Sequence, residues 1–122
     1  MLGNVVLWKP SPLAMLSNYL VLQVLHEAGL PKNVIQFIPG PPEKICEQTF
    51  KHPDFASLHF TGSTAVFKHL WKEIAQNIDT LKSYPRIVGE TGGKNFHLLH
   101  HSADVQNAVL QSVRGAFEFQ GR

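Results

Sequence analysis

The sequence lacks several features that identify whole classes of protein. It has one cysteine, Cys46, so no disulfide can form within the chain and a reducing compartment is expected. No apolar run approaches the roughly 20 residues of a membrane-spanning helix. The 11 basic and 9 acidic residues are scattered, without the basic and aromatic alternation that follows a nucleic-acid backbone. We therefore expect neither a membrane nor a nucleic-acid partner.

What remains is the composition of an ordinary folded domain. The chain has 122 residues, of which 43% are hydrophobic and 16% charged, enough for one domain with its own core. Residues 1–8 show no basic, small-residue pattern of an export signal and instead begin with a strand-like apolar run. No targeting signal is therefore recognised.

Short apolar runs alternate with helix-type segments along the chain. Strands are expected at residues 4–8, 34–38, 57–60, 86–88 and 95–99, and helices at residues 13–28, 43–50 and 65–78. Ser102 is expected to cap a last helix. This alternation predicts an α/β fold: a Rossmann-like, doubly wound, mainly parallel sheet with helices on both faces.

The apolar positions predict which surfaces are buried. The helix at residues 13–28 is apolar nearly all round and is expected to be mostly covered. The next long helix places Phe67, Leu70, Trp71 and Ile74 on one face, and Trp8, Phe60 and Trp71 are expected in the core. The inward stripe of the last helix is expected to be Val105, Ala108, Val109, Val113, Ala116 and Phe117.

One junction between a strand and a helix suggests an anion site. The strand that ends at Phe60 runs through Gly62 into a helix whose first residues, Ser63 and Thr64, carry hydroxyl groups. Glycine permits a tight turn there, and the helix amides and dipole favour a phosphate. Many ordinary helices start in the same way, so this motif alone is weak. However, Lys9, Gly40, Gly62 and Glu90 all follow predicted strands, and this common placement predicts a single site.

Four motifs, in this order, resemble the cofactor-binding domain of NAD(P)-dependent aldehyde dehydrogenases over essentially the whole chain. Residues 5–11 resemble the family's strand that ends in a ribose-binding lysine, and residues 27–40 resemble its helix-to-strand connection. Residues 60–63 resemble its dinucleotide loop, and residues 90–94 resemble its general-base glutamate motif. The resemblance implies NAD as the cofactor.

The same resemblance implies roles for individual residues. Cofactor-binding roles fall on Lys9, Ser11, Gly62, Ser63, Thr64, Ala65 and Val66. Glu90 would activate the water that hydrolyses the acyl-enzyme, and its glycine neighbours leave room for that water. Alternatively, Lys9 is a solvated cation and Glu90 an exposed residue at a strand end.

One departure from the family pattern points to a branch of the family. Phe67 stands where many members have a second glycine of the dinucleotide loop. Residues 67–71 and 93–97 resemble the branch that oxidises glutamate semialdehyde, the Δ1-pyrroline-5-carboxylate dehydrogenases. That resemblance implies a small aldehyde substrate, the mitochondrial matrix, and homo-oligomers among full-length members.

The nucleophilic cysteine of the family has no counterpart in this sequence. Cys46 lies in a weak helix away from the motifs, so we interpret it as a packed structural thiol. The chain is therefore expected to be a fragment, residues 1–122 of a cofactor domain, without the catalytic and oligomerisation domains and inactive alone. The alternatives are a short non-catalytic dinucleotide-binding protein and a truncated isoform that associates with full-length subunits. His97 and His100 are expected on opposite strand faces, so no metal site is predicted.

Overall fold

The computed structural model describes residues 3–120. They divide into two compact units, the first ending at Thr91 and the second beginning at Gly92. The first unit contains, in order, β1 (Val6–Trp8), α1 (Met15–Glu27), β2 (Ile35–Phe37), α2 (Pro42–Phe50), β3 (Ser57–Thr61), α3 (Thr64–Gln76) and β4 (Arg86–Glu90). The second contains α4 (Val105–Phe117). Short 3-10 turns lie at Pro12–Ala14, Ile78–Thr80 and Glu118–Gln120.

The four strands form two parallel pairs. β1 pairs with β2, from Val6 opposite Ile35 to Trp8 opposite Phe37. β3 pairs with β4, from Ser57 opposite Arg86 to Thr61 opposite Glu90. The α/β class with parallel strands joined through helices is confirmed. In residues 3–120, however, the strands form two sheets and not the single sheet that we predicted, because β1 and β3 each pair along one edge only.

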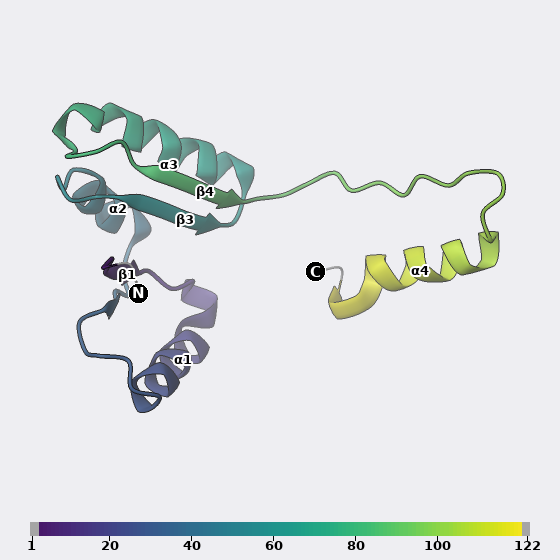
Figure 1. The fold of residues 1–122 in the computed structure, drawn as a ribbon, viewed down its shortest axis with the longest axis horizontal. Coiled ribbons are helices and arrows are strands. Elements are labelled where there is room, and N and C mark those ends of the chain that lie inside the picture. Colours follow the sequence, from purple (N-terminus) through teal and green to yellow (C-terminus); the bar gives the residue numbers. More distant parts are fainter. Residues whose placement is uncertain (1–2, 121–122) are drawn as a thin grey trace. The chain divides into compact units, whose positions relative to one another are not determined.

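The core of the first unit lies beside the β3–β4 pair. Phe50 of α2, Phe55, and Leu70 and Ile74 of α3 are buried together. Leu58, Phe60 and Ile87 pack against this cluster and alternate along the two strands, so they come from one face of the pair. Figure 1 shows α3 running alongside β3 and β4. The predicted face of α3 is correct for Leu70 and Ile74 but wrong for Trp71, which is 56% exposed.

Helix α1 begins at Met15, two residues after the predicted start at residue 13, and its predicted burial is wrong. A 3-10 turn starts at Pro12 and leads directly into α1. Within α1 only Leu22 is buried, although Tyr19 places its ring 5.8 Å from that of Phe37 in β2. The sequence shows that this surface is apolar, but the described residues include no element that covers most of it.

The second unit differs from the prediction at three places. Residues 95–99 form no strand, because no other strand of the described chain pairs with them. Ser102 does not cap α4; Asp104 does, its carboxylate accepting a hydrogen bond from the Asn107 amide. Of the predicted inward stripe only Ala108 is buried. None of the helices in residues 3–120 has the length and apolar character needed to cross a membrane.

Candidate functional site

The first turn of α3 forms the best-defined part of the candidate site. Ser63 is the N-cap, and its hydroxyl oxygen accepts a hydrogen bond from the Val66 amide at 3.2 Å. The Ser63 carbonyl accepts a second bond from the Phe67 amide at 3.0 Å. Of the two hydroxyl residues at this helix start, the N-cap is therefore Ser63. Because its oxygen acts only as an acceptor here, the Ser63 hydroxyl keeps its hydrogen for a ligand.

Three consecutive amides at this helix start have no acceptor among residues 3–120. They belong to Ser63, Thr64 and Ala65. Unpartnered amides at a helix start, together with the positive end of the helix dipole, bind anions well. Val66 is different, because its amide already bonds the Ser63 hydroxyl and so supports the cap. The donor set therefore suits a phosphate group.

Gly62 has a role that the sequence did not indicate. Its amide donates to the Glu90 carbonyl at 3.1 Å, so this amide is not available to a ligand. Its φ is also not positive, and the reason for glycine is space: an added Cβ would lie 2.6 Å from the Phe60 ring. Gly62 thus ties the turn to β4.

Glu90 lies at the carboxyl end of β4, next to this turn. It is in register with Thr61, the last residue of β3. Side chains alternate along a strand, so Glu90 and Thr61 share the face opposite to the one that carries Phe60 and Gly89. The Glu90 side chain is exposed, which leaves its carboxylate accessible to water. The structure therefore brings the predicted phosphate turn and the predicted base to one end of one strand pair.

Lys9 and Ser11 follow the other strand pair. The Lys9 ammonium donates to the Pro10 carbonyl at 2.9 Å and is partly buried. Ser11 precedes the 3-10 turn; its carbonyl accepts from the Ala14 amide, and its exposed hydroxyl makes no cap bond. A bond from the Ile38 amide to the Trp8 carbonyl aligns the carboxyl ends of β1 and β2, the two strands that Lys9 and Gly40 follow. The expectation that Lys9, Gly40, Gly62 and Glu90 form a single site remains a prediction.

Cys46 has the surroundings of a structural thiol. It lies in α2 and packs against the core cluster. Burial, reinforced by the nearby Glu73 carboxylate, raises the pKa of the Cys46 thiol, and Lys9 only partly opposes this shift. A raised pKa disfavours the thiolate that acts as a nucleophile, which supports the structural interpretation.

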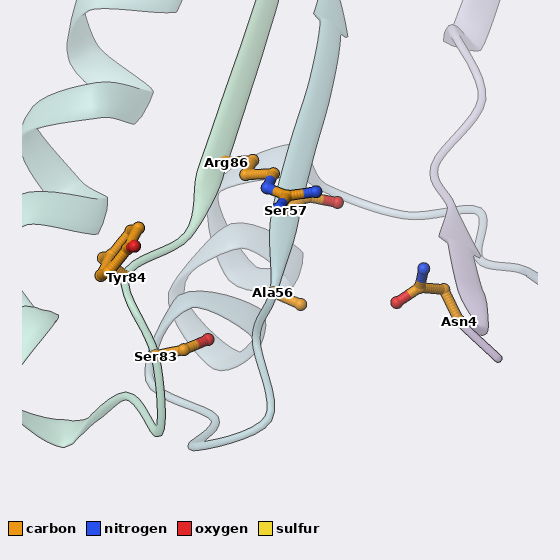
Figure 2. A pocket seen from close by; sticks show the side chains of 6 residues that line it. All are labelled: Asn4, Ala56, Ser57, Ser83, Tyr84 and Arg86. Atoms are coloured by element: carbon orange, nitrogen blue, oxygen red, sulfur yellow. The ribbon is translucent and has the colours of Figure 1, made fainter. Parts of the chain in front are cut away.

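A cavity of about 350 Å³ lies elsewhere in the first unit. Figure 2 shows that its lining includes Ser57 and Arg86, the first residues of β3 and β4, together with Asn4 and Tyr84. This is the amino end of the strand pair. Ligands of parallel sheets bind at the carboxyl ends, so this cavity is separate from the candidate site.

The histidines of the second unit make local hydrogen bonds. His97 pairs with the Ser112 hydroxyl at 2.8 Å, and His100 pairs with the Ser102 hydroxyl at 2.8 Å. Across residues 3–120 no group of three His, Cys, Asp or Glu side chains is arranged to hold a metal ion.

Comparison with known proteins places these features in a family. The model of the "Aldehyde dehydrogenase family" matches residues 1–122. The chain is 65% identical over its whole length to a Delta-1-pyrroline-5-carboxylate dehydrogenase of Agaricus bisporus, and it covers 22% of that protein. It is 49% identical over its whole length to the mitochondrial Delta-1-pyrroline-5-carboxylate dehydrogenase of Homo sapiens, again covering 22% of it.

The fold of this chain is also similar to that of a solved structure. The Delta-pyrroline-5-carboxylate dehydrogenase of Mycobacterium tuberculosis, in a crystal structure bound with NAD, is similar to this chain with a TM-score of 0.90 and 46% sequence identity. The match covers 98% of this chain and 22% of that one. The chain thus spans less than a quarter of the length of the relatives that it matches.

Proposed function

Because this chain belongs to the aldehyde dehydrogenase family, we propose that it is the cofactor-binding segment of an NAD-dependent Δ1-pyrroline-5-carboxylate dehydrogenase. Such an enzyme oxidises L-glutamate 5-semialdehyde to glutamate in proline breakdown. Residues 1–122 would form the NAD-binding domain, and other parts of a longer chain would supply the nucleophilic cysteine, the substrate contacts and the oligomerisation strands. By itself the segment would not oxidise aldehydes.

The observation that carries this proposal is the hydrogen bond between the Gly62 amide and the Glu90 carbonyl. It joins a turn with free anion-binding amides to an exposed carboxylate at the same end of one strand pair. The proposed reaction needs the cofactor to be anchored by its phosphates and a water-activating base to stand at the same end of the sheet. The relatives of the same name, 49% and 65% identical over the whole chain, support the assignment of the substrate.

The roles of the cofactor-binding residues follow from their hydrogen bonds. Ser63, Thr64 and Ala65 would donate their amides to the pyrophosphate, with the Ser63 hydroxyl as a fourth donor. Gly62 and Val66 would hold the shape of the turn. Lys9 and Ser11 would contact the adenosine ribose, for which the Lys9 ammonium would exchange its bond to the Pro10 carbonyl. When bound, NAD supplies a hydride acceptor.

Glu90 would act in the second half of the reaction. After the aldehyde carbon has been oxidised on the cysteine, a water must attack the resulting thioester, and a carboxylate can take a proton from that water. The exposed Glu90 side chain can reach solvent from the end of β4. Relatives named as mitochondrial support a mitochondrial compartment. Within it we propose the matrix, and for the full-length enzyme a homo-oligomer.

A pre-steady-state experiment on the complete enzyme tests this assignment. Glu90→Gln should leave a burst of NADH of about one per active site and slow the steady rate by roughly 10²–10⁴-fold, because only thioester hydrolysis loses its base. Glu47→Gln is the control, since the Glu47 carboxylate forms only an exposed pair with Lys51. Loss of the burst together with turnover would place Glu90 before hydride transfer, and unchanged turnover would remove it from the reaction.

A further inference from the structure

Two stacked rings cover two glycines where β3 and β4 end. Phe60 of β3 lies opposite Gly89 of β4 and stacks on Phe67 of α3, with ring centroids 6.1 Å apart and planes 18° apart. A Cβ added at Gly89 would lie 2.5 Å from two atoms of the Phe67 ring, and one at Gly62 would lie 2.6 Å from the Phe60 ring. Carbon atoms in contact normally stay about 3.5–4.0 Å apart. The rings therefore fill the space of both missing side chains.

Space alone explains the glycine at position 89. Gly89 does not have a positive φ, so its backbone conformation is open to any residue. With the Phe67 ring in this position, a side chain at position 89 would overlap it. If this is correct, a smaller residue at position 67 should make an alanine at position 89 acceptable.

Two aromatic rings pack against the Phe67 ring. Phe60 stacks on it, and Trp71 packs against it with a centroid distance of 5.9 Å. Its backbone belongs to the first turn of α3, where its amide bonds the Ser63 carbonyl. Moving the ring away from Gly89 would disturb its packing against Phe60 and Trp71.

The backbone beneath the ring belongs to the candidate site. Gly89 directly precedes Glu90, whose carbonyl accepts the Gly62 amide. A displacement of β4 at Gly89 would consequently move the Glu90 backbone and strain its bond to Gly62. The contact between Phe67 and Gly89 therefore affects both the phosphate turn and the backbone of the proposed base.

We propose that Phe67 and Gly89 form an interlocked pair that fixes the Glu90 backbone against the Gly62 turn, which makes Phe67 a positioning residue. This rests on the function proposed above for Glu90 and the turn. In this role Phe67 acts through the Glu90 backbone and not by contact with substrate or cofactor. Its ring sets the separation of α3 from the end of β4, and thereby the distance between the cofactor's phosphates and the base.

The interlock is tested first on the 122-residue chain, without any activity. Gly89→Ala should lower the ratio of folded to unfolded chain roughly ten- to hundredfold, because the added methyl overpacks the ring. Phe67→Ala should also destabilise, but adding Gly89→Ala to it should cost about twofold or less. Gly115→Ala is the matched control and should cause no loss, since nothing lies within 4 Å of a Cβ at that position. Additive losses in the double variant would overturn the interlock.

The positioning role is tested by kinetics of the complete enzyme. Gly89→Ala should keep the NADH burst but slow the steady rate roughly ten- to hundredfold and raise the KM for NAD, with both effects reduced in the double variant. Non-additive stability with unchanged kinetics would leave Phe67 as core packing and overturn the positioning role. Absence of NAD-dependent turnover in the parent enzyme would instead remove the function on which this role rests, while the stability result would still stand.

Discussion

Helices α3 and α4 have the same length, 13 residues, and both begin at a side-chain cap, but the two caps differ in charge. Ser63 caps α3 with a neutral hydroxyl, and Asp104 caps α4 with a carboxylate. Both satisfy one amide of the first turn, so both stabilise a helix. Only the neutral cap leaves the positive end of the helix dipole available to an external anion.

The two helices differ in packing as well. α3 buries Leu70 and Ile74 in the core beside the β3–β4 pair, whereas α4 buries only Ala108. A phosphate site requires a helix start that is held in a fixed place, and α3 has both the core and the bond from Gly62 to Glu90. A capped amphipathic helix is therefore not enough to indicate a phosphate site. The features that distinguish α3 are its neutral cap, its packing in the core and the carboxylate next to its start.

The largest expected difference between the helices is in stability. Leu70→Ala should destabilise the chain by about 2–5 kcal/mol, because Leu70 is 8% exposed and its removal leaves a cavity. Leu110→Ala in α4 should change stability by roughly 0.5 kcal/mol or less, since Leu110 is 67% exposed. Urea unfolding followed by circular dichroism measures both. Equal losses in the free energy of unfolding would show that α4 is packed in solution and would contradict this difference between the helices.

A negative charge at the cap of α3 should give this helix the same kind of start as α4, which does not favour an anion. Ser63→Asp should keep the helix capped, since aspartate caps as well as serine, as Asp104 does here. NAD binding to the complete enzyme should weaken roughly a hundredfold or more, because the carboxylate would face the pyrophosphate. Titration calorimetry gives the affinity, and circular dichroism confirms that the helix persists. Unchanged NAD affinity would remove Ser63 from the cofactor site.

A smaller effect is expected at the cap of α4. Asp104→Ala should cost about 1 kcal/mol of helix stability, because the Asn107 amide loses its acceptor. Ser102→Ala should cost less, since the Ser102 hydroxyl bonds His100 and no helix amide. Hydrogen exchange of the first-turn amides of α4 separates the two variants. A larger loss for Ser102→Ala would reinstate the cap that the sequence predicted.

Local signals in the sequence predicted the elements well. The start of α1 at a proline turn, the Ser63 cap and the parallel strands around α3 follow from residues that lie close together in the chain. The placement of α4 was correct, but its cap was not, because Ser102 and Asp104 are both good caps and the backbone decides between them.

Long-range partners could not be predicted in the same way. The strand expected at residues 95–99 and the buried faces expected for α1 and α4 need covering elements, and apolar character does not specify where these are. The sequence likewise gave no sign that Gly62 bonds Glu90, because this bond depends on the register of β3 against β4. Phe67 departs from the family pattern in the sequence, but its contact with Gly89 emerges only from the packing of α3.

On the proposed function, the start of α3, and not that of α4, binds the pyrophosphate of NAD. The most direct measurement is a titration of the 122-residue chain with millimolar NAD, followed by the amide signals of both first turns in a nitrogen-proton NMR spectrum. We expect the amide signals of Ser63, Thr64 and Ala65 to shift in a saturable manner. The amide signals of Val105 and Gln106, which lie next to the Asp104 carboxylate, should not shift. Shifts at both helix starts, or at neither, would contradict it.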